Sequence, residues 1–221
     1  MRYLLPALGF VTPSFSARAQ TTLEPAVLEH FTTDAGTYLY VSGVQYRGKL
    51  RYEPETENVV KLGFRTHVVV WVNGKPEKLY AEDVKSFSLE NRFFISTDSE
   101  GRGPTGVDSA DFEGTFVQLA DTGRLELGRR YAGATSGGGY GPVSYTIGHE
   151  WLIRQRKGGW TIIPRPALGG YSSKKFRAML AKYFADRPDL LDSLKNESLT
   201  YQDLEQAVHA YNSGEPTFFI E

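Results

Sequence analysis

Apolar and polar positions alternate most regularly within residues 143–163. The odd positions carry large apolar or aromatic residues and one histidine: Val143, Tyr145, Ile147, His149, Trp151 and Ile153. A repeat of two residues is the spacing of a strand with one buried face. Gly158 and Gly159 interrupt the pattern before Trp160. The segment therefore predicts a β-hairpin whose buried face includes His149 and Trp151.

A second hairpin is predicted over residues 112–131, with its turn at Asp121, Thr122 and Gly123. The glycine-rich run 135–142 joins the two hairpins. A phosphate-binding loop needs a helix N-terminus behind it, and here strands follow. The run therefore predicts a flexible connection.

Earlier in the chain, aromatic and β-branched runs predict further strands. These strands cover residues 38–42, 44–52, 59–64, 67–72, 77–80 and 92–96. Asn73 and Gly74 predict a type I′ turn, because both residues tolerate a positive φ. Residues 97–110 are rich in Asp, Ser, Gly and Pro and predict a surface loop.

After Pro164 and Pro166 the periodicity becomes helical. Ser172 or Ser173 is the predicted cap of the first helix. The second helix is predicted over residues 188–195, with Pro188 at its first position. Thr200 is the predicted cap of the third helix, which residues 212–214 end. Their apolar stripes consist of Phe176, Leu180, Tyr183 and Phe184, and of Leu204, Val208 and Tyr211. Because the stripes are short, the helices must dock on the sheet.

The predicted fold class is α+β, an antiparallel sheet or partly closed barrel with a C-terminal helical cap. Residues 37–214 form one domain, with a β-rich part at 37–166 and the cap at 172–213. Residues 20–36 lack periodicity and predict a mobile mature N-terminus.

Residues 1–19 have the pattern of a secretory signal peptide, with Arg2, an apolar stretch at 4–11, and Ala17-Arg18-Ala19. Cleavage after Ala19 would leave Gln20 as the first residue. An apolar terminus or a first strand is the alternative. The stretch is far shorter than the ~20 residues that span a membrane, so we expect a secreted or periplasmic protein without a transmembrane segment.

Composition narrows the functional classes. The 25 basic and 26 acidic residues leave a net charge of −1, which lacks the basic excess of nucleic-acid-binding proteins. The absence of cysteine excludes disulfides, thiolate metal sites and a lipid anchor on cysteine. The hydrophobic content of 40% is enough for a core.

Candidate metal sites are weak. His149-Glu150 lacks a second histidine four residues later, because position 153 is Ile. Glu205 and His209 lie one helical turn apart, but two ligands rarely hold zinc. The acidic residues at 98–111 miss the EF-hand spacing. We therefore predict no metal, no cofactor and no catalytic residue.

The three tryptophans Trp71, Trp151 and Trp160 are the candidates for a binding face, since aromatic rings stack on sugars. Packing in the core is the alternative for each of them.

Three groups of residues also carry a family resemblance. The first group, in the early strands, consists of Gly43 and residues 48–50. The second consists of residues 79–80 with Asp83, Val84 and Phe87. The third consists of residues 150–154 and 158–161, followed by Phe176, Leu180, Tyr183, Phe184, Asp186, Leu190, Tyr211 and Asn212. Together they resemble a broad family of uncharacterised secreted or envelope proteins of Bacteroidetes-type bacteria. The resemblance covers most of residues 37–212. It implies location and fold and transfers no activity.

The functional expectation is a non-enzymatic envelope protein that binds another protein or a surface glycan. The alternative is a hydrolase that acts on an envelope substrate through a histidine and carboxylate site. An exposed aromatic patch in a groove would favour binding. A carboxylate bonded to His67 or His149 in a cleft would favour the enzyme.

Overall fold

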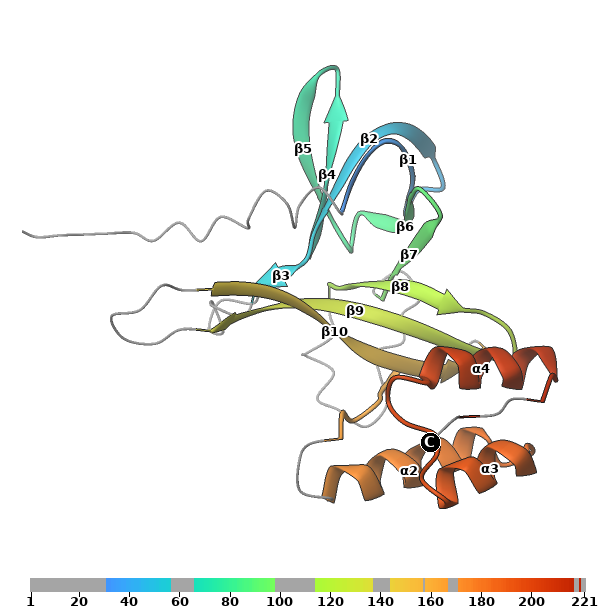
Figure 1. The fold of residues 1–221 in the computed structure, drawn as a ribbon. Coiled ribbons are helices and arrows are strands. Elements are labelled where there is room, and N and C mark those ends of the chain that lie inside the picture. The colour runs from blue at the N-terminus through green and yellow to red at the C-terminus, as the bar shows by residue number, and fades with distance from the viewer. Residues whose placement is uncertain are drawn as a thin grey trace, which may run out of the picture.

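A computed structural model describes residues 31–56, 66–97, 114–136, 144–156, 158–166, 171–216 and Phe219 (Figure 1). The predicted cleavage site between Ala19 and Gln20, the predicted strand at 59–64 and the acidic residues at 98–111 lie outside the described residues. None of the described helices has the length and apolar character needed to cross a membrane.

The described residues form strands first and helices afterwards. The strands are β1 (Thr32–Tyr40), β2 (Gln45–Glu53), β3 (Glu55–Thr56), β4 (His67–Val72), β5 (Lys75–Tyr80), β6 (Val84–Leu89), β7 (Arg92–Ser96), β8 (Phe116–Asp121), β9 (Leu125–Ser136), β10 (Ser144–Gln155) and β11 (Thr161–Ile162). The helices are α2 (Tyr171–Tyr183), α3 (Pro188–Lys195) and α4 (Leu204–Ser213). This order confirms the α+β class.

One sheet contains all of these strands, in the order β11-β10-β9-β8-β7-β6-β1-β2-β4-β5. Every pair along this path is antiparallel, as predicted. The sheet curls strongly, and β3, which continues β2, pairs in parallel with β9 (Figure 1). The β1–β2 and β4–β5 hairpins lie at the end of the molecule opposite the helices (Figure 1).

Both predicted hairpins of the central segment are present, as the pairs β8–β9 and β10–β11. In addition, β9 and β10 pair with each other without a register shift, from Ser136 opposite Ser144 to Leu125 opposite Gln155. The glycine-rich run therefore joins two strands that pair with each other. Its residues 137–142 lie outside the described part of the chain.

The first strand begins earlier than predicted, at Thr32 rather than beyond residue 36. Phe31 is buried, and its ring meets that of Tyr52 edge to face at 5.6 Å. A register shift between Thr33 and Gly36 interrupts the alternation of side chains. Residues 31–36 therefore belong to the sheet and not to a mobile terminus, and the bulge explains why periodicity missed them.

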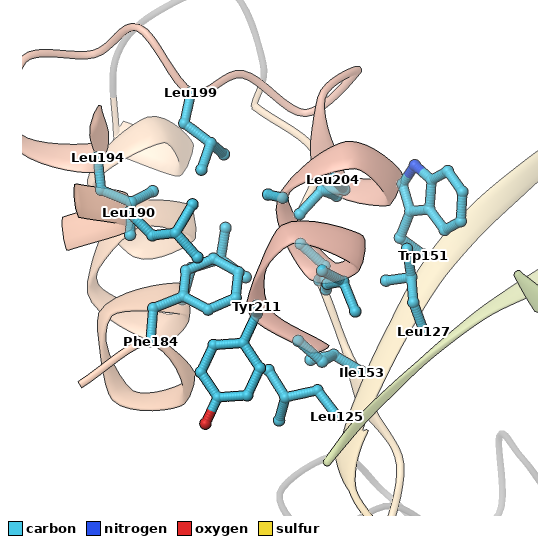
Figure 2. Packing of buried hydrophobic residues seen from close by; sticks show 14 of the residues in the cluster. Leu125, Leu127, Trp151, Ile153, Phe184, Leu190, Leu194, Leu199, Leu204 and Tyr211 are labelled. Atoms are coloured by element: carbon cyan, nitrogen blue, oxygen red, sulfur yellow. The ribbon is translucent and has the colours of Figure 1, made fainter. Parts of the chain in front are cut away.

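The helical cap docks on one face of β9 and β10, as the alternation predicted (Figure 2). Leu125 and Leu127 of β9 and Trp151 and Ile153 of β10 are buried against the helices. The helices contribute Phe176, Leu180, Phe184, Leu190, Leu194, Leu204, Ala207, Val208 and Tyr211. His149 was predicted to be buried on this face, and this prediction is wrong, because the side chain is exposed where β10 extends beyond Trp151.

The described residues form two further cores. An aromatic core lies inside the curled strands, where the rings of Phe87 and Phe94 stack at 4.5 Å. A smaller core contains Leu152 and Trp160. It is packed closely against Gly128, where an added Cβ would lie 2.3 Å from Val117 Cγ1.

Local turn predictions are confirmed. Asn73 and Gly74 have φ values of 52° and 78°, as the predicted turn requires. α4 ends at Gly214, which has a left-handed φ of 77°. The predicted cap of the first helix is wrong, because α2 begins at Tyr171 and Ser172 and Ser173 therefore lie within its first turn.

Candidate functional site

The structure does not bring the three predicted tryptophans together. Trp71 on β4 is partly exposed. Trp151 is buried under the helices, and Trp160 is buried in the separate small core. The charged groups of Lys49 and Arg51 lie 5.2 and 5.7 Å from the centre of the Trp71 ring. The three side chains therefore do not form a shared binding face, and only Trp71 is partly open to a ligand.

Exposed apolar side chains gather instead at the tips of two hairpins. We call Val41, Val44, Tyr46 and Val72 the hairpin patch; they are between 39% and 49% exposed. The first three lie at or beside the β1–β2 turn, and Val72 precedes the β4–β5 turn. β2 pairs with β4 in an antiparallel register, so both turns lie at the same end of the paired strands.

A cluster of three tyrosines supports the hairpin patch. The rings of Tyr38 and Tyr46 stack at 5.4 Å, and Tyr40 meets both rings edge to face at 5.5 Å. Burial raises the pKa of Tyr38 and of Tyr40, and Tyr46 and Glu77 raise both pKa values further. The phenols therefore stay neutral at physiological pH, and the packed rings form a preorganised platform.

His67 contacts a carboxylate, but across neighbouring strands of the sheet. It lies opposite Glu53 in the β2–β4 register, and its Nε2 is 2.8 Å from Glu53 Oε2. The carboxylate lies off the direction of the ring N–H, so the contact is not an aligned hydrogen bond. Arg51 Nη2 lies 2.6 Å from the other carboxylate oxygen. This arrangement is a cross-strand charged cluster that stabilises the sheet.

Glu53 gives the protein an acid-sensitive contribution to stability. The contact with His67, with Arg51 adding to it, lowers the pKa of Glu53 from 4.5 to about 2, although partial burial acts in the opposite direction. A lowered pKa stabilises the folded state above the unfolded pKa, and this contribution is lost as the pH falls from about 4.5 to about 2. We expect Glu53→Gln to lower the free energy of unfolding by about 1–3 kcal/mol at pH 7.

Urea unfolding at pH 7, 4 and 3 measures this effect. The difference in the free energy of unfolding between the wild type and Glu53→Gln should become smaller as the pH is lowered. Glu215→Gln is the matched control, because Glu215 is exposed. A constant difference at all three pH values would contradict the assignment.

His149 has rings and cations as its neighbours. Its ring meets Trp151 edge to face at 5.1 Å and lies 6.2 Å from Tyr131. The side chain is exposed on one side, yet the atoms on its other side lower its pKa by desolvation, and Arg129 and Arg165 lower it further. The neutral ring is therefore favoured, and these contacts are those of a packing residue at the edge of the helix-covered core.

A third histidine lines a cavity of about 630 Å³ between α4 and the strands. We call this cavity the α4 cleft. Its lining residues come from β7, from the end of β8 with the following turn, and from α4: Phe93, Leu119, Ala120, Asp121, Thr122, His209, Asn212 and Ser213.

Asp121 is the fixed centre of the α4 cleft. A register shift between Leu119 and Asp121 places Asp121 opposite Leu127, and therefore on the face that the helices cover. Its Oδ2 lies 2.9 Å from His209 Nδ1, and its Oδ1 accepts a hydrogen bond of 2.6 Å from Asn212 Nδ2. The Asp121 side chain is only 12% exposed, whereas that of His209 is 67% exposed.

Asn212 fastens α4 to the β8–β9 turn. Its amide donates to the carbonyl of Leu125 at 2.9 Å and accepts from the Leu125 backbone N–H at 3.0 Å. Gly123 is required beside it, because an added Cβ would lie 2.4 Å from Asn212 Cγ. The turn, Asp121 and the C-terminal end of α4 therefore form one rigid unit.

His209 and Glu205, one helical turn apart in the sequence, have different partners in the structure. His209 bonds to Asp121, whereas Glu205 forms an ion pair with Arg129. The described residues contain no group of three or more side chains suited to hold a metal. The Asp121–His209 contact joins residues 88 positions apart, and no local pattern could have indicated it.

Comparison of the chain with known proteins found no matching family model, no matching curated protein and no matching solved structure. The resemblance to secreted or envelope proteins of Bacteroidetes-type bacteria therefore stays a prediction.

Proposed function

We propose that this chain is a non-enzymatic envelope protein, secreted or periplasmic, that binds another protein through the hairpin patch. The signal-like pattern of residues 1–19 supports the location. The observation that carries the binding proposal is the exposure of Val41, Val44 and Tyr46 at the tip of the β1–β2 hairpin and of Val72 at the tip of the neighbouring β4–β5 hairpin. Exposed apolar side chains in one patch mark interaction surfaces, whereas single ones are common on any protein.

The chemistry of the hairpin patch favours a protein over a glycan as the partner. Three of its four side chains are valines, which offer no hydrogen bonds to sugar hydroxyls. Tyrosine, by contrast, is enriched in protein interfaces, where its large ring is buried at a small entropic cost. A complementary apolar surface on a partner protein would cover the patch and leave the rim, including Lys75 and Glu77, in water.

Side-chain docking is better supported than the addition of a strand to the sheet edge. The outer strand β5 carries Pro76, Lys75 and Lys78. Proline and lysine on an edge strand hinder pairing with another strand. The return of β3 to β9 supports a partly closed barrel as the rigid base from which the two hairpins project.

A hydrolase is the second candidate, favoured by the Asp121–His209 pair in the α4 cleft. A hydrolase also needs a nucleophile or an activated water beside the histidine. Among the described residues, the hydrogen-bond partner shown for His209 is Asp121. The binding function is therefore the better supported of the two.

Site-specific photo-crosslinking tests the location of the interface. A photoreactive residue at position 46, within the patch, is expected to crosslink to one protein partner in envelope extract. The same residue at position 202, which is exposed beside α4, is the matched control and should give no such product. Equal crosslinking from both positions would contradict a localised interface.

A further inference from the structure

We propose that the α4 cleft binds a small saccharide, independently of the hairpin patch. The cleft volume of about 630 Å³ falls within the ~300–1,000 Å³ range of small-molecule sites. One wall of the cleft is apolar and the other is polar, and the contacts of Asp121 and Asn212 described above fix the polar wall.

The apolar wall is built from β7 and β8. Phe93 lies directly opposite Leu119 in the register of the two strands, and 46% of Phe93 is exposed. A pyranose ring presents C–H groups on its face and hydroxyls around its rim. The face can pack on the exposed phenyl ring, while the rim reaches the polar groups across the cleft.

The polar wall is centred on His209. Its Nδ1 is engaged by Asp121, which leaves Nε2 as the ring nitrogen available to a ligand. When Nδ1 carries the proton, Nε2 accepts a hydrogen bond, and a sugar hydroxyl is a suitable donor. Thr122 and Ser213 also line the cleft, and their hydroxyls can donate or accept.

The arrangement is preorganised for binding. The side-chain amide of Asn212 donates hydrogen bonds to Asp121 Oδ1 and to the backbone carbonyl of Leu125. The carboxylate that orients His209 is therefore fixed before a ligand arrives, which lowers the entropic cost of binding.

Other ligand classes fit the cleft less well. No lysine or arginine is among its described lining residues, and anionic ligands such as phosphates are usually bound by such cations. Asp121 and His209 give a metal ion only two side-chain ligands of the usual types. A neutral ligand with several hydroxyls and one apolar face can pack on the apolar wall and form hydrogen bonds with the polar wall.

Ligand-observed saturation-transfer NMR tests the proposal on the whole folded protein. The panel comprises glucose, galactose, mannose, N-acetylglucosamine and their short oligomers. We expect at least one of them to bind with a Kd in the millimolar range or tighter. Phe93→Ser and His209→Ala should each weaken that binding by about fivefold or more, which corresponds to ~1 kcal/mol.

The controls separate the α4 cleft from the hairpin patch. Phe93 is exposed, so Phe93→Ser should keep the wild-type circular dichroism and melting temperature. His209→Ala should keep the wild-type circular dichroism, because Asn212 still donates to the Asp121 carboxylate. Val41→Ser, in the hairpin patch, should leave saccharide binding unchanged. The proposal is overturned if no member of the panel binds, or if both cleft variants bind as tightly as the wild type.

Discussion

Phe184→Ala is expected to lower the free energy of unfolding by about 3–5 kcal/mol. Phe184 directly follows α2 and is fully buried, and its ring lies 5.7 Å from that of Tyr211 on α4 (Figure 2). Removing the ring opens a cavity that several elements line at once. Because the helices and the β9–β10 strands share this core, the sheet and the helices should unfold in one transition.

Chemical denaturation followed by tryptophan fluorescence and by circular dichroism measures both effects. Phe93→Ala is the matched control, because it removes a phenyl ring from an exposed position. It should lower the free energy of unfolding by less than about 1 kcal/mol. Two separate transitions, or an unchanged midpoint in Phe184→Ala, would show that the helical cap is an independent appendage.

Arg154→Ala is expected to lower the free energy of unfolding by about 3–5 kcal/mol, because it leaves the largely buried Glu126 carboxylate without its partner. Arg154 Nε donates to Glu126 Oε2 at 2.6 Å, and the two side chains are 6% and 14% exposed. The guanidinium also lies 4.2 Å from the centre of the buried Trp160 ring. The substitution therefore removes an ion pair and a cation–π contact together.

The double variant Arg154→Met with Glu126→Leu separates these causes. It removes both charges and keeps apolar volume in place, so it should recover most of the stability lost in Arg154→Ala. Urea unfolding of the three proteins measures the difference. If the free energy of unfolding of Arg154→Ala lay within about 1 kcal/mol of the wild-type value, the Arg154–Glu126 pair would contribute little to stability.

The sequence predicted the layout of the fold where the alternation of side chains and the packing surface coincide. Trp151 and Ile153 follow the period of two and lie under the helices whose stripes were read from Phe184 and Tyr211. The same alternation placed His149 in the core, and there it failed. Periodicity shows which face a residue occupies, whereas the extent of the helical cap decides how much of that face is covered.

The candidate sites were largely beyond prediction from sequence. Tyrosine and valine are ordinary strand residues, so nothing local showed that Val44 and Tyr46 stay exposed at a hairpin tip. Asp121 and His209 meet because a bulge in β8 and the docking of α4 bring distant residues together. Such contacts depend on tertiary packing, and their residues carry no shared motif.

The binding of a protein partner by the hairpin patch can be measured directly. Once the crosslinked partner is purified, its affinity should be measured by isothermal titration calorimetry against the wild type and against the double variant Val44→Ser with Val72→Ser. Both side chains are exposed, so the variant should keep the wild-type melting temperature. We expect the double variant to lose affinity by about tenfold or more, equivalent to ~1.4 kcal/mol. An affinity equal to that of the wild type would show that the hairpin patch is not the binding surface.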